Sequence, residues 1–216
     1  GGSATDFSGT LQVGAFANPD GNEDNVLWEE TFGNGLDGWI TTGTCFNPDS
    51  NANATWKYIP DGLIDKGSFI FAGFQINSPT LCDGAVAVDS DFDDTNGTED
   101  FGGGPCPAPG QYFLVSPALF TGDWNAAGIT ATWNQAIRQF QSTYFISFRT
   151  NTTGGTWTDW RDFQINTEFE TNANAADNDV QRIFLGGAAE GDSLQIRFVY
   201  NANFYFWGID DVRLVE

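Results

Sequence analysis

Short segments in which apolar and polar residues alternate recur along this 216-residue chain, and they constrain its fold more than any other feature. A period of two is typical of half-buried β-strands, whereas the 3.6-residue period of amphipathic helices is almost absent. Turns rich in Gly, Asn and Asp separate the segments. The sequence therefore predicts about a dozen strands in an all-β sandwich or jelly roll. The segments are 11–16, 26–32, 54–59, 68–74, 85–88, 112–115, 129–133, 144–149, 156–165, 180–185 and 194–200.

The chain has the composition of one folded domain with a different amino-terminal segment. Its 20 Phe and 8 Trp can fill a core, and no apolar run approaches the roughly 18 residues of a membrane span. Residues 1–25 are rich in Gly, Asn and Asp, so we interpret them as an N-terminal extension or peripheral strand and 26–216 as the domain. If the strand at 11–16 pairs with another molecule, the protein self-assembles by strand addition.

The net charge of -21 limits the partners. A field of this sign repels nucleic acid and anionic membranes, and it concentrates counter-ions, divalent cations above all. The alternative interpretation of the acidity is solubility at high ionic strength.

The closing segment, 204–214, is an aromatic strand that carries two neighbouring carboxylates, Asp210 and Asp211. Strict alternation would place them on opposite faces. A carboxylate against apolar surroundings must be protonated, paired or bound to a metal ion. Either a cation or an arginine would satisfy this requirement: Arg213 shares the face of Asp211, and Arg197 is another strand arginine able to reach one of the two.

The densest acidic segment, 89–100, also favours a cation. Asp89, Asp91 and Asp93 place oxygen ligands at alternate positions, which suits calcium. An EF-hand is rejected because Asp94 stands where that loop requires glycine and no flanking helices are predicted. A calcium site in a β-sandwich loop and a solvated acidic loop remain the two interpretations.

The three cysteines, Cys45, Cys82 and Cys106, indicate an oxidising compartment. A bridge between Cys82 and Cys106 would restrain the acidic loop between them and is the pairing we predict. Cys45 with either partner is equally compatible with the count.

Catalysis has little support. Without histidine there is no Ser-His-Asp or Cys-His machinery, and a pair of carboxylates acting on a glycosidic bond is the one remaining route. We expect no enzyme. Trp157 and Trp160 are predicted on opposite strand faces, so at least one belongs to the core and the other is a sugar-stacking platform or an edge residue.

Several motifs occur in the order found in one protein family. They are Glu-Glu-Thr-Phe at 29–32, Leu-Asp-Gly-Trp at 36–39, Ala-Val-Ala-Val-Asp at 85–89, Leu-Val-Ser-Pro at 114–117 and Ile-Asp-Asp-Val at 209–212. In this order the chain resembles, from about residue 26 to 216, the cleaved-adhesin or choice-of-anchor J domains of secreted Bacteroidetes proteins, which include gingipain adhesin modules, and more distantly the MAM domain.

The resemblance implies a jelly-roll β-sandwich of the galactose-binding or MAM-like type, non-catalytic, stabilised by calcium and secreted or displayed on the cell surface. Glu30, Asp89 and Asp210 or Asp211 match the family's calcium-associated positions. The resulting hypothesis is an extracellular calcium-binding adhesion domain whose target is carbohydrate or protein on a cell surface or matrix. The alternatives are a subunit of an extracellular filament or surface layer, and an accessory or catalytic domain of a polysaccharide-active enzyme.

Overall fold

The computed structural model of the chain describes residues 25–67, 73–122, 124, 128–151, 155–170, 175–186 and 192–216. The predicted strand at 11–16 and nearly all of the predicted N-terminal extension lie outside these residues, so the division of the chain at residue 25 stays a prediction. No helix in the described residues is long and apolar enough to cross a membrane.

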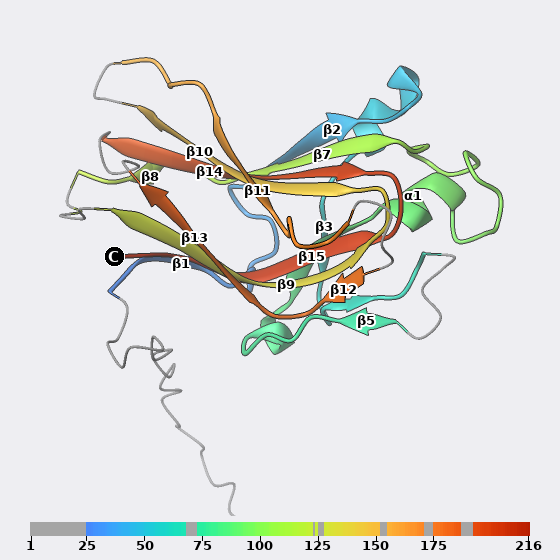
Figure 1. Ribbon diagram of the computed structural model, residues 1–216, viewed down its shortest axis with the longest axis horizontal. Coiled ribbons are helices and arrows are strands. Elements are labelled where there is room, and N and C mark those ends of the chain that lie inside the picture. Colours follow the sequence, from blue (N-terminus) through green and yellow to red (C-terminus); the bar gives the residue numbers. More distant parts are fainter. Residues whose placement is uncertain are drawn as a thin grey trace, which may run out of the picture.

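The described strands form two antiparallel sheets packed face to face, as Figure 1 shows, which confirms the predicted all-β sandwich. One layer, the β9–β15 sheet, has the order β12-β9-β15-β6-β3, with β1 beside β15 and β13 beside β9. Its strands are β1 (Val26–Glu30), β3 (Lys57–Ile59), β6 (Ala85–Asp89), β9 (Ile129–Gln139), β12 (Ala175–Asp177), β13 (Val180–Gly186) and β15 (Phe206–Val215).

The other layer, the β10–β14 sheet, has the order β11-β10-β14-β7-β2, with β8 also beside β14. Its strands are β2 (Ile40–Thr44), β7 (Gly110–Val115), β8 (Leu119–Phe120), β10 (Thr143–Asn151), β11 (Arg161–Ile165) and β14 (Ser193–Ala202). The connections include a small hairpin of β4 (Leu63–Ile64) and β5 (Phe74–Gln75) and the 3-10 turns η1 (Pro48–Asn53) and η2 (Leu81–Asp83).

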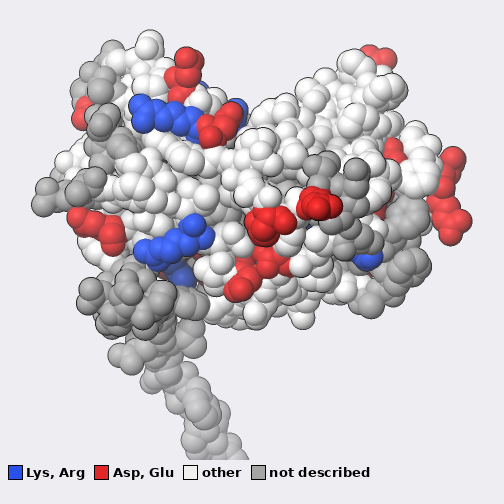
Figure 2. Space-filling model, in the orientation of Figure 1, with Lys and Arg blue, Asp and Glu red and all other residues white. Residues whose placement is uncertain are grey.

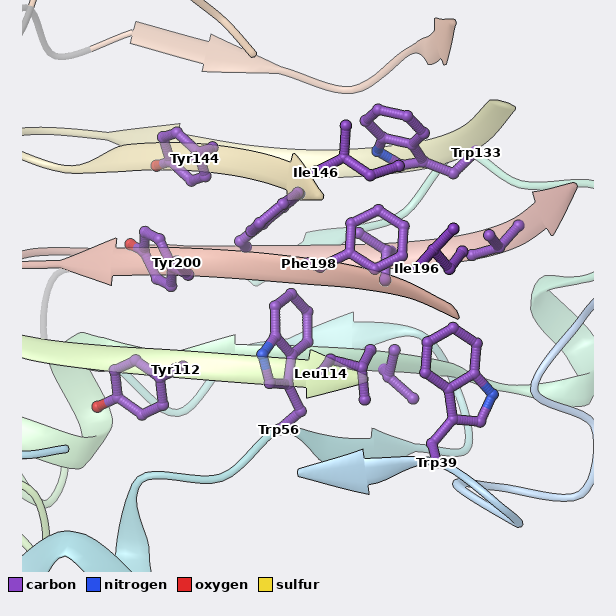
Figure 3. Close-up of a cluster of buried hydrophobic side chains, with 14 of the residues drawn as sticks. Trp39, Trp56, Tyr112, Leu114, Trp133, Tyr144, Ile146, Ile196, Phe198 and Tyr200 are labelled. Atoms are coloured by element: carbon purple, nitrogen blue, oxygen red, sulfur yellow. The ribbon is translucent and has the colours of Figure 1, made fainter. Parts of the chain in front are cut away.

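Alternation in the strands directs one row of side chains from each sheet into the core. Figure 3 shows Tyr112, Tyr200 and Tyr144 in line on β7, β14 and β10. The rings of Tyr144 and Tyr200 stack with centroids 4.9 Å apart, and Trp207 of β15 meets Tyr144 edge-on at 5.2 Å. The closing strand is therefore a core strand, as its aromatic residues predict.

The acidic segment is not the loop that its charge predicts. Its first part forms a short helix, α1 (Ser90–Thr95), and this helix ends at Asn96, which has the left-handed conformation. Asp89 caps the helix, since its Oδ1 accepts a hydrogen bond from the Phe92 backbone N–H at 3.1 Å. Carboxylates in the first turn also interact favourably with the helix dipole. The same aspartates that suggested a solvated loop are good helix-starting residues.

The predicted bridge between Cys82 and Cys106 is wrong. Cys106 is bonded to Cys45, and Cys82 lies exposed in η2 with a free thiol. The reason is the order of strands: Cys45 follows β2, Cys106 precedes β7, and these two strands are neighbours with Thr44 opposite Gln111. The bridge ties together the loops at one end of that strand pair.

Candidate functional site

A β-bulge in β15 brings Asp210 and Asp211 to the same place. Against β9, Asp210 pairs with Asn134 and the register resumes only at Arg213, so β15 has one residue more than its partner there. Asp211 takes the positive φ of 48° that the irregularity requires. Both carboxylates then reach one hydroxyl: Ser78 Oγ lies 2.6 Å from Asp210 Oδ2 and 2.5 Å from Asp211 Oδ2. The prediction of opposite faces is therefore wrong, because the bulge interrupts the alternation on which it rests.

The two carboxylates are fully buried and are satisfied mainly by neutral donors. Thr80 Oγ1 donates to Asp211 Oδ1 at 2.8 Å, and Asn134 Nδ2 donates to Asp211 Oδ2 at 3.0 Å. Burial, together with the negative charge of Asp211, raises the pKa of Asp210 to about 7.

The arginine that shares the face of Asp211 gives little compensation for this charge. Arg213 Nη2 is 3.6 Å from Asp211 Oδ1 but 2.6 Å from Glu29 Oε1. Arg197 lies on the other sheet and pairs with Asp162 instead, so the alternative that it reaches Asp210 or Asp211 is wrong. The pair thus carries more negative charge than the cations beside it neutralise.

Glu30 does not join this pair through any described contact. Its two carboxylate oxygens accept hydrogen bonds from the Phe32 backbone N–H at 2.8 Å and from Trp39 Nε1 at 3.1 Å. Glu30 therefore stabilises the turn after β1. In the portion of the chain that the structure describes, no group of three or more acidic or cysteine side chains is placed to hold one metal ion. Among the six predicted ligands, Asp210 and Asp211 converge on one hydroxyl group.

Asp89, Asp91 and Asp93 are tied into the structure around α1. Asp91 Oδ1 accepts from the Tyr205 backbone N–H at 2.9 Å, and Asp93 Oδ1 accepts from Lys57 Nζ at 2.5 Å. Burial raises the pKa of all three carboxyl groups, that of Asp89 to about 7. In each of them Oδ2 is buried without a hydrogen-bond partner among the described residues. The charges of Asp91 and Asp93 also raise the pKa of Asp89, so the three carboxylates lie near one another, but they do not form a group placed to hold one metal ion.

A second cluster lies on the outer face of the β10–β14 sheet and joins aromatic rings to two arginines. The Arg149 guanidinium is 4.8 Å from the Trp157 ring centre and 4.5 Å from that of Trp160. The Arg197 guanidinium is 4.3 Å from Trp160 and 5.2 Å from Phe113. Trp160 is therefore shared by both cations. We call these five side chains the arginine–tryptophan cluster.

Polar side chains hold both guanidinium groups in place. Gln195 Oε1 accepts from Arg149 Nε at 2.9 Å and from Nη2 at 2.6 Å. Asp162 Oδ1 accepts from Arg197 Nη2 at 3.1 Å and from Ser147 Oγ at 2.6 Å. Burial lowers the pKa of both arginines, although both stay protonated at neutral pH.

The cluster lies on a partly exposed face of the molecule. The outline in Figure 2 is hollowed above the β10–β14 sheet, between a shoulder near the ends of β10 and β11 and another near η1, where Figure 1 places these elements. Trp157 and Trp160 are partly exposed, and Asp162 is exposed. This face can therefore meet a ligand with ring stacking and hydrogen bonding at once.

The structure changes the prediction for the two tryptophans. Residues 155–160 precede β11 without pairing in a sheet, so strand alternation does not apply to them. Both rings contact one guanidinium, and neither belongs to the buried core. The arginines were missed as site residues, although the alternation at 144–149 and 194–200 already places Arg149 and Arg197 on the polar face of their strands.

An aromatic pocket of about 190 Å³ lies where the β9–β10 and β14–β15 turns meet the loop after α1. Phe101, Phe140, Phe204 and Tyr205 line it. Phe101 and Phe204 meet edge-on at 6.0 Å, and the Phe101 side chain is 55% exposed. This aromatic pocket is the alternative place at which a ligand could stack on an aromatic ring.

Comparison with known proteins gives architectural similarity at low identity. No family model matches the chain, and no curated protein matches it. The K1 cleaved adhesin domain of Lys-gingipain from Porphyromonas gingivalis W83 is 14% identical, with a TM-score of 0.47 over 87% of this chain and 96% of that one. TmCBM61 in complex with β-1,4-galactotriose is 13% identical, with a TM-score of 0.43 over 85% and 92%.

The enzymatically active domain of tailspike protein 4 from bacteriophage CBA120 is 10% identical, with a TM-score of 0.48 over 84% of this chain. This chain spans 20% of the length of that one. At these values the similarities assign no function, and membership of the cleaved-adhesin family stays a prediction.

Proposed function

We propose that this protein is a non-catalytic binding domain that recognises carbohydrate through the arginine–tryptophan cluster on the outer face of the β10–β14 sheet. One observation carries the proposal: Trp160 contacts two fixed arginines on the outer face of the sheet and does not belong to the buried core. A surface aromatic alone would need no explanation. Its combination with fixed polar groups does.

The chemistry of the cluster suits a sugar ring. The C–H faces of a pyranose pack against an indole, while its hydroxyl groups need planar donors and acceptors beside the ring. The two arginines contact Trp160 and supply the donors, while Gln195 and Asp162, which are bonded to them, supply acceptors. The groups are held by one another, so little side-chain entropy is lost on binding.

The test is a glycan array followed by affinity measurements with Trp160→Ala and Phe101→Ala. We expect the wild-type protein to retain at least one glycan and Trp160→Ala to weaken that binding about tenfold or more, because a stacked aromatic is commonly a binding hot spot. Phe101→Ala is the matched control from the aromatic pocket. Loss of binding in Phe101→Ala alone would move the site to that pocket, and retention of only protein ligands would refute carbohydrate as the target.

An extracellular location belongs to the same proposal. The Cys45–Cys106 bridge supports an oxidising compartment, where structural disulfides persist. Release of reducing ends from any glycan that the protein retains would contradict the non-catalytic assignment.

We also propose that one calcium ion stabilises the domain at Asp210 and Asp211, with the hydroxyl groups of Ser78 and Thr80 as further oxygen donors. The donor set fits, since calcium takes carboxylate, hydroxyl, amide and carbonyl oxygens at flexible geometry. An ion there would offset the charge that Arg213 compensates only weakly. Two buried carboxylates against one hydroxyl are the supporting observation.

Thermal unfolding in calcium and in EGTA tests this second proposal. At ten times its dissociation constant a ligand adds about 1.4 kcal/mol of stability. In a chain of this length that raises the Tm by roughly 3–6 °C. The calcium-dependent rise should vanish in Asp211→Asn and persist in Asp49→Asn, which changes an exposed aspartate. An equal Tm in both buffers at 10 mM calcium would remove the proposed ion.

A further inference from the structure

The distribution of cations narrows the class of ligand. The chain has only 8 Lys+Arg against 29 Asp+Glu, yet two of its arginines share one tryptophan in the cluster. Arg197 lies near enough to Arg149 that the positive charge of Arg149 helps to lower the pKa of Arg197, after burial. With Asp162 as the acid in contact, the cluster holds two positive charges and one negative.

Arg149 is the less compensated of the two. Its Nε and Nη2 donate to Gln195, which is neutral, and within the described residues no carboxylate pairs with it. The Trp157 and Trp160 rings beside its guanidinium attract a cation but accept no strong hydrogen bond.

Arg197 also has unused donor capacity. Its Nη2 donates to Asp162 and the side chain is 17% exposed, so a ligand would meet the terminal nitrogens. Its Nε is buried without a hydrogen-bond partner among the described residues and is out of reach of a surface ligand. A guanidinium has five N–H donors in a fixed fork, which matches the two oxygens of a carboxylate or sulfate. The cluster therefore holds two forks with more donors than local acceptors.

The overall charge does not prevent an anion from binding here. At an ionic strength of 0.15 M the screening length is about 8 Å, so the distant acids act weakly at the cluster. Arg149 and Arg197 act at contact distance in partly desolvated surroundings, where a charge-assisted hydrogen bond is stronger. The local positive charge of the two arginines therefore determines whether an anion binds at the cluster.

From these contacts we propose that the ligand of the arginine–tryptophan cluster is an acidic polysaccharide, whose carboxylate or sulfate group bonds to Arg149 and Arg197 while a sugar ring packs on the tryptophans. This inference rests on the proposed carbohydrate function and adds the charge of the ligand. It predicts discrimination between glycans that differ only in an acidic group.

The experiment uses two matched pairs of probes at 0.15 M NaCl with EGTA. Polygalacturonate is compared with its methyl ester, and a sulfated galactan with the same galactan after desulfation. We expect wild-type protein to bind at least one acidic probe about tenfold or more tightly than its neutral counterpart, since each charge-assisted hydrogen bond contributes roughly that factor. The pair that shows the difference distinguishes carboxylate from sulfate.

Variants then locate the effect. Arg149→Gln and Arg197→Gln should each weaken binding of the acidic probe about tenfold and leave the neutral probe unchanged. Arg149→Lys, which keeps the charge without the fork, should lie between. Arg182→Gln is the matched control, because it makes the same change of charge on β13 of the other sheet. Circular dichroism and Tm confirm that each variant is folded.

The results separate the acidic specificity from the carbohydrate function. Equal binding of the acidic and neutral probes, with loss of both in Trp160→Ala, would overturn the acidic specificity and keep the carbohydrate function. An equal weakening in Arg182→Gln and Arg149→Gln would also overturn it, because overall charge would then be the cause. If no probe or array glycan is retained, both proposals fail.

Discussion

Replacing Cys45 and Cys106 by serine should lower the free energy of unfolding by about 4 kcal/mol. The bridge joins residues 61 apart, and closing a loop of that length removes this much conformational entropy from the unfolded chain. Both side chains are also buried, at 7% and 1% exposure, so their loss brings no compensating gain from solvation. For a chain of this size the fall in Tm should be roughly 8–16 °C.

Urea denaturation followed by tryptophan fluorescence measures the loss, because several tryptophans are in the core. Cys82→Ser is the matched control, since Cys82 is exposed and unbridged, and its stability should stay within about 0.5 kcal/mol of wild type. A reducing agent should lower the stability of wild type and Cys82→Ser but not of the double variant. If Cys82→Ser proves to be the destabilised protein, or the double variant loses less than about 1 kcal/mol, the pairing or the entropic argument is wrong.

Three further predictions concern packing and buried charge. Gly43→Ala should lower the free energy of unfolding by at least about 2 kcal/mol, because the alanine Cβ would come 2.1 Å from the Gln111 carbonyl oxygen. Gly33→Ala is the control, since its Cβ meets only ordinary van der Waals contacts. Equal Tm values for the two variants would contradict this prediction. Burial raises the pKa of Asp89 from 3.8 to about 7, so the folded protein keeps a proton that the unfolded chain releases, and stability falls as the pH rises from about 4 to 7. Measured in EGTA, the stability of Asp89→Asn should fall less than that of the wild type over this pH range, and above pH 7 the variant should be the more stable protein. A stability–pH profile equal to that of the wild type would exclude the raised pKa of Asp89. Ser78→Ala removes the hydroxyl shared by two buried carboxylates and should cost about 1–3 kcal/mol in a chemical denaturation curve; no loss would show that another donor replaces it.

The strands were predictable because their signal is local. Residues 144–149 and 194–200 alternate apolar and polar side chains, and both lie in strands whose apolar rows face the core. The short helix α1 was not predicted, although Asp89, Asp91 and Asp93 are favourable at a helix start, because the acidic run was interpreted as a loop, either calcium-binding or solvated. The helix-start signal was thus present in the sequence, but the acidic composition of the segment favoured a loop prediction.

The site depends on neighbours that a single sequence does not specify. Arg149 and Arg197 share Trp160 only because β10 and β14 are adjacent and in a register that sets Ser147 opposite Arg197. Asp210 and Asp211 converge only because a bulge in β15 breaks the alternation that separated them. Calcium binding at that pair stays a prediction.

Sequence alone determined the class of the fold and the face of many side chains, since the period of two and the turn residues act over a few neighbouring positions. Tertiary structure decided which distant residues meet: Cys45 with Cys106, 61 positions apart, and Ser78 with Asp210, 132 positions apart. Strand order and register determine these contacts, and they arise from packing the two sheets over one core, where a shift of one residue would exchange the buried and exposed rows.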